Sequence, residues 1–318
     1  MSRLNVSVII PVYQATQYVE NAVVSALQFD CVKEVVVVLD EDSPSLHDLA
    51  VQWSKIHERV IITQHPGGAH RGAGASRNQG LRVASCPYVA FLDADDWYLP
   101  NRFDLSTKIF DQKEDVDFVY EAIATSFETE QGKELYLARG NKEITYVASP
   151  ISSGIKMFEA MLCQPDFGWF HLNGLTIKKA SLQILFDEQL PQMQDTDFIR
   201  RLCLYSQLIE GGNMATPVAM RRIHDHNRIL KNQEEKLTSK KRLANKWFLL
   251  MLRHTFSKPC NQKIIKDKLS AEMDYHHPAS WIWVKLRLSA ILLFLTHPLA
   301  ITKFLLGAQS TEPVLIEK

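Results

Sequence analysis

The five cysteines of this 318-residue sequence are scattered, and no two of them form a Cys-x-x-Cys pair. They are Cys31, Cys86, Cys163, Cys203 and Cys260. This spacing argues against a cysteine-based zinc site and against a disulfide framework, and it suits a reducing compartment. We therefore expect a cytoplasmic protein. Its composition, with 46% hydrophobic and 23% charged residues, indicates an ordinary globular chain rather than a disordered one.

Long apolar runs are also absent. A helix that spans a bilayer needs about 20 apolar residues, whereas the uncharged run Leu288–Leu295 has eight. The first apolar run, Val6–Ile10, is stopped by Pro11, which predicts a buried strand rather than a signal peptide. Any membrane contact is therefore expected to be peripheral, on the cytoplasmic face.

The sequence lacks the glycine motifs of two large nucleotide-binding classes. A dinucleotide-binding fold needs Gly-x-Gly-x-x-Gly directly after its first strand, and a P-loop needs Gly-x-x-x-x-Gly-Lys-Ser/Thr. The first strand is followed here by Pro11-Val12-Tyr13-Gln14. A nucleotidyltransferase on a related sheet needs a glycine-rich loop with Arg or Lys at the same place, and that loop is missing as well.

The charges balance overall but are unevenly distributed. Residues 1–220 carry 18 Lys and Arg against 28 Asp and Glu, whereas residues 221–303 carry 17 against 6. A basic C-terminal third predicts an anionic partner. We expect membrane phosphate rather than nucleic acid, because the sequence has no interleaved aromatic and basic motif of the kind that RNA-binding sheets use.

Strand and helix patterns alternate along the first 100 residues. The expected strands are at 6–10, 34–39, 60–62 and 88–92, and the expected helices are near 18–27, 46–56 and 75–84. Near-continuous apolar strands separated by helices are typical of a parallel sheet that is covered on both faces. The fold class is therefore α/β, with a mostly parallel sheet and helices on both sides.

Carboxylates follow two of the expected strands directly. Asp40 comes after the second strand, and Asp93, Asp95 and Asp96 come after the fourth. Ligands in such sheets bind outside the carboxyl ends of the strands, and packed carboxylates repel one another unless a cation neutralises them. The pattern favours a site for a divalent cation and a diphosphate over a solvated acidic turn.

Five segments resemble the motifs of the family 2 glycosyltransferases, which have the GT-A fold. Four of them lie in order in the first 100 residues, and the fifth is looser; they are Val8–Tyr13, Val37–Ser43, Gly74–Leu81, Phe91–Asp96 and Gln194–Arg200. Gly74–Leu81 matches the Arg-Asn-x-Gly helix, and Phe91–Asp96 matches the Asp-x-Asp segment. The chain departs from the family at Leu39, Glu41 and Gln194, where Asp, Gly and Glu are common.

The resemblance implies roles for individual residues. Those expected to bind the donor are Pro11, Tyr13, Asp40, Arg77, Asp93 and Asp95. Those expected to hold Mn²⁺ or Mg²⁺ are Asp95, Asp96 and His224. Asp195 is the implied general base. The acceptor side is expected to involve Trp169, His171 and Gln194, the first two on the glycine-bounded stretch 168–174. Asp40 and Asp195 have the alternative roles of simple strand and helix caps.

The implied reaction moves a sugar from a nucleotide-diphosphate donor, first of all a UDP-sugar, to a hydroxyl of a glycan or lipid-linked acceptor. Inversion by direct displacement needs one carboxylate to take the acceptor's proton and no second carboxylate as nucleophile. Leu39 and Gln194 leave a second hypothesis open, namely a catalytically silent, membrane-associated module that binds nucleotide sugars.

Two domains are expected. Residues 1–227 form the GT-A catalytic domain, with a nucleotide-sugar-binding half at 1–105 and an acceptor half at 106–227. Residues 228–318 form a basic, amphipathic helical extension. Within 281–306 the polar residues recur on one narrow stripe of a broad apolar surface. This segment either lies in the membrane interface or packs on the catalytic domain or in a dimer seam.

Overall fold

The computed structural model describes residues 4–41, 48, 51, 53, 57–212, 215–224 and 233–275. The chain divides into two compact units. The first comprises Met1–Met161, Pro165–Gln189 and Gln194–Lys231, and the second comprises Leu162–Gln164, Leu190–Met193 and Asn232–Lys318. The segment 281–306, and most of the helix expected at 46–56, lie outside the described residues.

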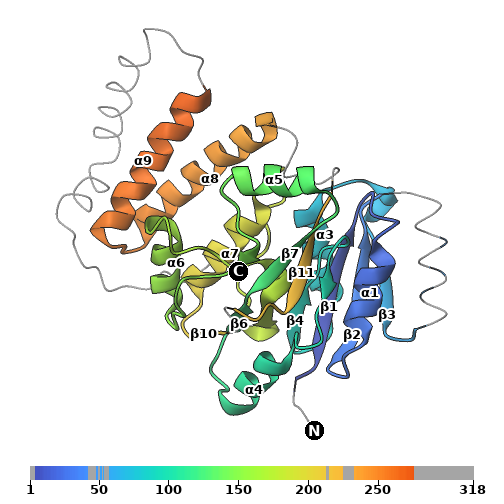
Figure 1. Ribbon diagram of the computed structural model, residues 1–318. Helices are drawn as coiled ribbons and strands as arrows, with labels where there is room; N and C mark the ends of the chain where they lie inside the picture. Colours follow the sequence, from blue (N-terminus) through green and yellow to red (C-terminus); the bar gives the residue numbers. More distant parts are fainter. Residues whose placement is uncertain are drawn as a thin grey trace. The chain divides into compact units, whose positions relative to one another are not determined.

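A seven-stranded sheet forms the centre of the first unit, in the order β10-β6-β9-β4-β1-β2-β3 (Figure 1). Its strands are β1 (Val6–Val12), β2 (Val32–Leu39), β3 (Val60–Gln64), β4 (Tyr88–Phe91), β6 (Phe118–Glu121), β9 (Leu175–Lys178) and β10 (Ile209–Gly212). Neighbouring strands are parallel except around β9, which runs antiparallel to β4 and β6. The expected α/β fold with a mostly parallel sheet is confirmed, with one reversed strand.

The carboxyl ends of β1, β2 and β4 lie at one edge of this sheet, because β1 is parallel to both of its neighbours. We call it the carboxyl edge. Leu39 ends β2 and Phe91 ends β4. Asp40 and the turn at 93–96 therefore leave the sheet on the same side, which is where ligands bind in folds of this class.

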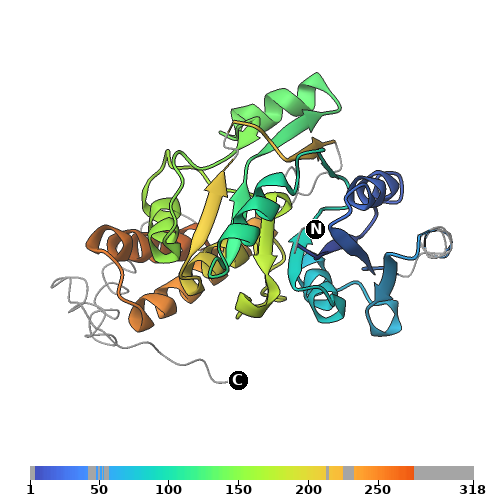
Figure 2. The same ribbon diagram turned by 90° about the horizontal axis from the view of Figure 1, so that it is seen from below.

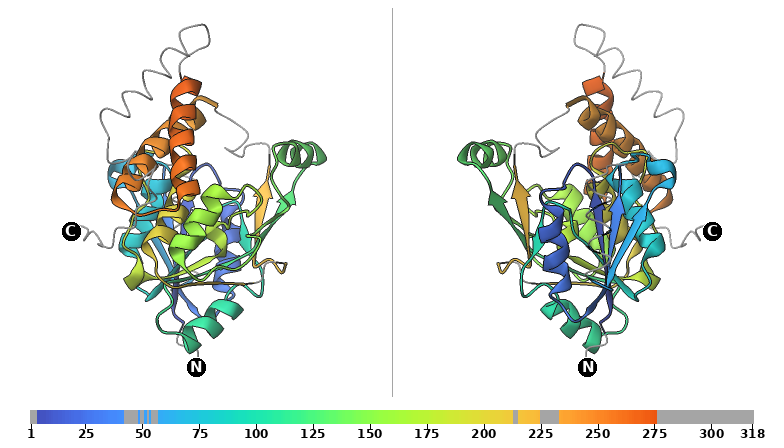
Figure 3. Two further views of the ribbon diagram at one scale, coloured as in Figure 1. Left: turned by 90° about the vertical axis from the view of Figure 1, so that its left-hand side faces the viewer. Right: turned by 90° about the vertical axis from the view of Figure 1, so that its right-hand side faces the viewer.

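Helices cover both faces of the sheet around β1. Val8 belongs to the hydrophobic cluster shared with α1 (Val19–Leu27). Its neighbour Ile9 points to the other face, against α3 (Ala73–Val83); Figure 3 shows the two helices on either side of the strands. A Cβ on Gly80 would lie 2.3 Å from Ile9 Cγ2, so α3 packs this close only because residue 80 is glycine.

A second sheet of four strands has the order β5-β11-β7-β8. Its strands are β5 (Trp97–Tyr98), β7 (Ile123–Phe127), β8 (Ile144–Thr145) and β11 (Ala219–Ile223). β7 leads into α5 (Glu130–Ala138), as the view from below in Figure 2 shows. β5 directly follows the acidic turn and pairs with β11, so the small sheet connects that turn to residues far along the chain.

The remaining elements complete the two units. They are α4 (Asp104–Gln112), α6 (Gly154–Cys163), α7 (Gln194–Tyr205), α8 (Gln233–Arg253), α9 (Lys258–Tyr275) and the short turns η1 (Pro66–Gly68), η2 (Leu172–Gly174) and η3 (Lys179–Ser181). In the second unit α8 and α9 pack against each other, and they are the expected C-terminal helices. No helix in the described ranges has the length and apolarity that a bilayer crossing requires.

Candidate active site

The turn after β4 holds its carboxylates in different surroundings. Arg77 Nη2 donates to Asp93 Oδ1 at 2.6 Å, and His224 Nε2 lies 3.1 Å from Asp95 Oδ2. The Asp93 and Asp95 side chains are about a quarter exposed, at 28% and 26%. Burial raises the pKa of Asp93, but the charge of Arg77 and other nearby groups outweighs burial, so the pKa is lowered overall.

Asp96 is buried, and both of its carboxylate oxygens are engaged with the protein. Oδ1 accepts the backbone N–H of Arg222 at 2.8 Å, and Oδ2 accepts Nδ2 of Asn173 at 2.6 Å. Burial, followed by the negative charges of Asp95 and Asp93, raises the pKa of Asp96 well above its ordinary value. Asp96 is therefore placed to anchor the turn, a role that differs from the metal ligation expected from the sequence.

Asn173 ties the two ends of the acidic turn together. Its Nδ2 donates to Asp96, and its Oδ1 accepts the backbone N–H of Asp93 at 3.3 Å. The side chain is fully buried in η2, just before β9. From the sequence Asn173 belongs only to a stretch expected near the acceptor, and an Asn-Gly pair before a strand is its one local signal. Its role depends on the antiparallel pairing of β9 with β4.

Arg222 clamps the other side of the turn. Its guanidinium lies 4.8 Å from the ring centroids of both Tyr18 and Trp97. Its Nε donates to the carbonyl oxygen of Asp95 at 3.0 Å, and its Nη1 lies 3.3 Å from Glu128 Oε1. Cation–π contact and charge-assisted hydrogen bonds together fix this arginine. Trp97, which begins β5, thus lies against Arg222.

Arg221 is the neighbour of Arg222 on β11, and its charge acts on the acids of the site. Burial lowers the pKa of Arg221, but Tyr136 and three carboxylates outweigh burial and raise it overall. The carboxylates are Asp96, Asp195 and Asp93. Among the described residues, the guanidinium makes no direct hydrogen bond or ion pair. Arg221 therefore places a positive charge near these acids. The same charge attracts an anion that binds beside them.

Asp40 organises the loop before α3. Its Oδ1 accepts the backbone N–H of Arg71 at 2.7 Å, and its Oδ2 accepts that of Gly72 at 2.9 Å. His70 Nδ1 lies 3.0 Å from Oδ2. The ring of His70 stacks on Tyr13, with centroids 3.9 Å apart, and both rings are exposed. Pro11, in contrast, is held within β1 opposite Val38.

The helix α3 links the Asp40 loop to the acidic turn. Its first turn follows Gly72, which donates to Asp40, and Arg77 on the same helix pairs with Asp93. Arg77 Nε is buried and has no hydrogen-bond partner among the described residues. Asn78 makes hydrogen bonds through both its amide atoms to the backbone of Phe186. Asn78 thus has a structural role, whereas Arg77 pairs with Asp93 in the acidic turn.

Asp195 and His171 complete this charged region. Asp195 is half-buried in the first turn of α7, and its Oδ1 accepts the backbone N–H of Thr196 at 2.8 Å. Burial, followed by the charge of Arg221, lowers the pKa of His171 to about 4. The other charges that act on His171 are Asp93, Asp195 and Arg77. The charges of Asp195, the expected base, and of Asp93 on the donor side therefore both act on this imidazole.

The other residues expected on the acceptor side lie nearby in different settings. Trp169 is half-buried, with its ring 6.3 Å from that of His171 in an edge-to-face arrangement. Gln194 begins α7, and its side chain lies beside Gly74 of α3. Gln194 therefore packs on the donor-side helix.

Two side chains of the site, one carboxylate and one imidazole, suit a cation that a substrate also binds. Within the described residues, no group of three or more His, Cys, Asp and Glu side chains is placed to hold a metal ion. Asp95 and His224 nevertheless offer one carboxylate oxygen and one imidazole nitrogen side by side. Mg²⁺ is commonly bound by one or two carboxylates together with phosphate oxygens of the substrate, and this pair meets that requirement.

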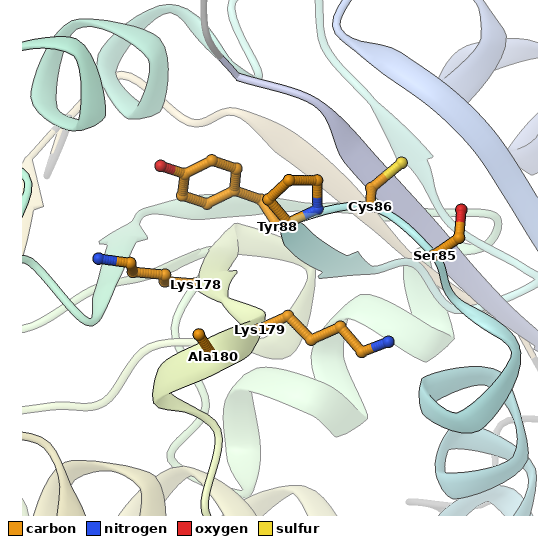
Figure 4. Close-up of a pocket in the computed structure, with 7 residues that line it drawn as sticks. Ser85, Cys86, Tyr88, Lys178, Lys179 and Ala180 are labelled. Atoms are coloured by element: carbon orange, nitrogen blue, oxygen red, sulfur yellow. The ribbon is translucent and has the colours of Figure 1, made fainter.

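A hollow of about 470 Å³ lies at the opposite edge of the sheet, where β4 begins and β9 ends (Figure 4). It is lined by Ser85, Cys86, Pro87, Tyr88, Lys178, Lys179 and Ala180. The ammonium groups of Lys178 and Lys179 hydrogen-bond to the carbonyl oxygens of Glu114 and Ala84. The hollow contains none of the expected site residues.

The fold is that of a GT-A glycosyltransferase. The chain is similar to the crystal structure of S. aureus TarS 1–349 in complex with UDP-GlcNAc, with a TM-score of 0.62 and 16% sequence identity. The match covers 95% of this chain and 81% of that one. The sequence profile described as glycosyl transferase family 2 matches residues 7–165. The chain therefore belongs to glycosyltransferase family 2.

Two relatives are similar to parts of this sequence. One is the putative teichuronic acid biosynthesis glycosyltransferase TuaG of Bacillus subtilis (strain 168), 39% identical over 92 residues, or 29% of this chain. The other is the UDP-Glc:alpha-D-GlcNAc-diphosphoundecaprenol beta-1,3-glucosyltransferase WfgD of Escherichia coli, 27% identical over 116 residues, or 36% of this chain. The matched stretches span 36% and 44% of these relatives' own lengths.

Proposed function

We propose that this protein is an inverting, metal-dependent glycosyltransferase that moves a sugar from a nucleotide-diphosphate donor to a hydroxyl of a glycan or lipid-linked acceptor. The observation that carries the proposal is the meeting of donor-side acids, basic groups and Asp195 at the carboxyl edge of the sheet. Family membership supports it, and so does the donor bound to TarS, a protein of the same fold.

The nucleoside end of the donor is assigned to the region of Asp40. The exposed rings of Tyr13 and His70 offer a stacking surface for a base, and Asp40 holds the loop that carries His70. TarS was crystallised with UDP-GlcNAc and WfgD is named for UDP-Glc, which makes a UDP-sugar the first donor to test.

The diphosphate is assigned to the acidic turn and its basic neighbours. Asp95 and His224 would hold Mn²⁺ or Mg²⁺, which would stabilise the charge of the departing diphosphate as a Lewis acid. Arg77 Nε has no hydrogen-bond partner among the described residues, and Arg221 is a cation on which the charges of Asp93, Asp96 and Asp195 act. These groups favour the dianion that forms as the glycosidic bond breaks.

The transfer step needs one base, and Asp195 is assigned this role. Its carboxylate takes the proton of the acceptor hydroxyl while that oxygen forms a bond to the anomeric carbon. The bond from the anomeric carbon to the phosphate oxygen breaks, and its electron pair leaves with the nucleoside diphosphate. Attack opposite the leaving group inverts the configuration. Acceptors of the kind named for WfgD, linked to a lipid diphosphate, are consistent with a peripheral membrane position.

The test is release of nucleotide from a panel of UDP- and GDP-sugars with Mn²⁺, compared between the wild type and Asp195→Asn. Loss of a general base should lower kcat by about 10²- to 10⁴-fold, while donor affinity measured by calorimetry stays unchanged. Unchanged turnover in Asp195→Asn would refute the assignment of the base. Nucleotide binding without turnover in the wild type, over the whole panel, would support the silent module instead.

A further inference from the structure

The imidazole of His171 lies among the charged groups of the site, yet none of them makes a direct hydrogen bond to it. The groups whose charges act on it are Arg221, Asp93, Asp195 and Arg77. His171 caps η2, the turn that also carries Asn173. Its position is therefore fixed by the same segment that holds the acidic turn.

One ring nitrogen of His171 has an assigned hydrogen bond. The backbone N–H of Asn173 donates to Nδ1 at 3.2 Å. A neutral imidazole carries its proton on one nitrogen and accepts at the other, so the proton of His171 resides on Nε2. Burial and the neighbouring Arg221 favour the neutral ring by lowering its pKa to about 4.

The Nε2–H donor has no protein acceptor in the described part of the chain. His171 as a whole is only 2% exposed, yet its Nε2 is not among the fully buried side-chain atoms that lack a partner, so this N–H group is open to a ligand. An oxygen supplied by a ligand would satisfy it.

We propose that Nε2–H of His171 donates a hydrogen bond to a hydroxyl of the transferred sugar. This inference rests on the proposed function. The sugar must lie between the diphosphate, near Asp93, and the base, Asp195, and these are the two carboxylates whose charges act on His171. A rigid donor in a water-poor site contributes more to recognition than the same group would in water. His171 is thus a determinant of donor-sugar specificity.

The experiment compares the wild type with His171→Phe and His171→Gln in the full chain. Phenylalanine keeps a ring without the N–H, and glutamine restores an N–H donor near the same place. Calorimetry with UDP alone and with the UDP-sugar that gives the highest turnover separates nucleotide from sugar recognition. His171→Phe should leave the UDP affinity unchanged and weaken UDP-sugar binding by about 10- to 100-fold, and His171→Gln should recover part of the loss.

The matched control is His57→Phe, because His57 is exposed just before the start of β3, away from the carboxyl edge. It should change neither affinity. A second readout is independent of activity: long-range ¹H–¹⁵N spectra of histidine-labelled protein should show His171 as the Nε2–H tautomer near neutral pH, assigned by the signal missing in His171→Phe.

Three outcomes overturn the inference. One is an Nδ1–H tautomer or a charged ring near neutral pH. Another is an equal loss of UDP and UDP-sugar affinity in His171→Phe, which would indicate a purely structural role. The third is no loss of either. A wild type that binds no nucleotide sugar overturns the proposed function together with this inference, whereas the first three results concern His171 alone.

Discussion

The two edges of the central sheet differ in how many hydrogen-bond partners the protein gives to their charged groups. At the edge where β4 begins, Glu34 accepts hydrogen bonds from Ser7 Oγ, Ser85 N and Ser85 Oγ at 2.6, 2.6 and 2.7 Å, and two lysines are bound to carbonyl oxygens. At the carboxyl edge Arg221, Arg77 Nε and His171 Nε2 have no such partners among the described residues. The edges therefore differ in how many of their polar groups have hydrogen-bond partners within the described part of the protein.

The same contrast divides the carboxylates of the acidic turn. Asp96 is saturated by the protein, whereas Asp95 is partly exposed beside one imidazole. Two acids that are adjacent in sequence thus have different surroundings: Asp96 holds the backbone, and Asp95 stays partly exposed beside His224. Asn173 and Arg222 contact Asp96, and these contacts determine which of the two acids is engaged with the protein.

Neutralising Asp95 and Asp96 in turn is the most direct test of this difference between them. Asp95→Asn should weaken Mn²⁺-dependent UDP binding by more than the roughly 10- to 100-fold that loss of a supporting residue costs, with little change in stability. Asp96→Asn should lower the free energy of unfolding by about 1–3 kcal/mol. The NH₂ group of the new amide would face the N–H donor of Arg222 or of Asn173 and could not accept its hydrogen bond. Calorimetry and urea unfolding measure the two effects. The assignment is wrong if Asp96→Asn alone abolishes metal dependence at full stability.

A substitution at the opposite edge should affect folding without affecting chemistry. Glu34→Ala leaves the buried hydroxyl of Ser7 without its acceptor and removes the hydrogen bonds from the exposed Ser85, so we expect a loss of about 1–3 kcal/mol in the free energy of unfolding. The matched control is Glu20→Ala on the exposed side of α1, which should change stability by less than about 0.5 kcal/mol. A selective loss of kcat in folded Glu34→Ala would contradict the division between the edges.

The pH dependence of stability gives a smaller effect at the same residue. Burial raises the pKa of Glu34, but the hydrogen bonds from Ser7 and Ser85 outweigh burial and lower it overall. The ionised group therefore contributes stability above its unfolded pKa of about 4.3, and the contribution is lost as the pH falls through the lower folded pKa. Urea unfolding from about pH 3 to 7 should show a shallower slope in Glu34→Gln than in the wild type. Equal slopes would rule out this contribution.

Much of the fold of the first 100 residues could be predicted from the sequence, because its signals are local. The apolar runs gave β1, β2 and β4, and acids directly after them marked the carboxyl edge. The helix with Arg77 was expected from residue 75 and begins at Ala73, since the glycines before it make a turn that Asp40 holds. Parallel pairing then brought these segments to one side.

The supporting residues could not be predicted, because they act over long sequence separations. Asn173 meets Asp96 across 77 positions, and Arg222 meets it across 126. These contacts depend on the reversed strand β9 and on the small sheet, neither of which has a periodic signature of its own. The sequence showed three acids in the turn, but it could not show which of them the fold would saturate.

The position of β11 in the chain has a consequence for synthesis. This strand inserts between β5 and β7, and it delivers the backbone N–H that holds Asp96 and leads to the histidine beside Asp95. A nascent polypeptide that has emerged only as far as residue 218 carries every acid of the turn, but none of these counterparts. The acidic turn can therefore reach its final arrangement only after the last strand of the small sheet has been synthesised.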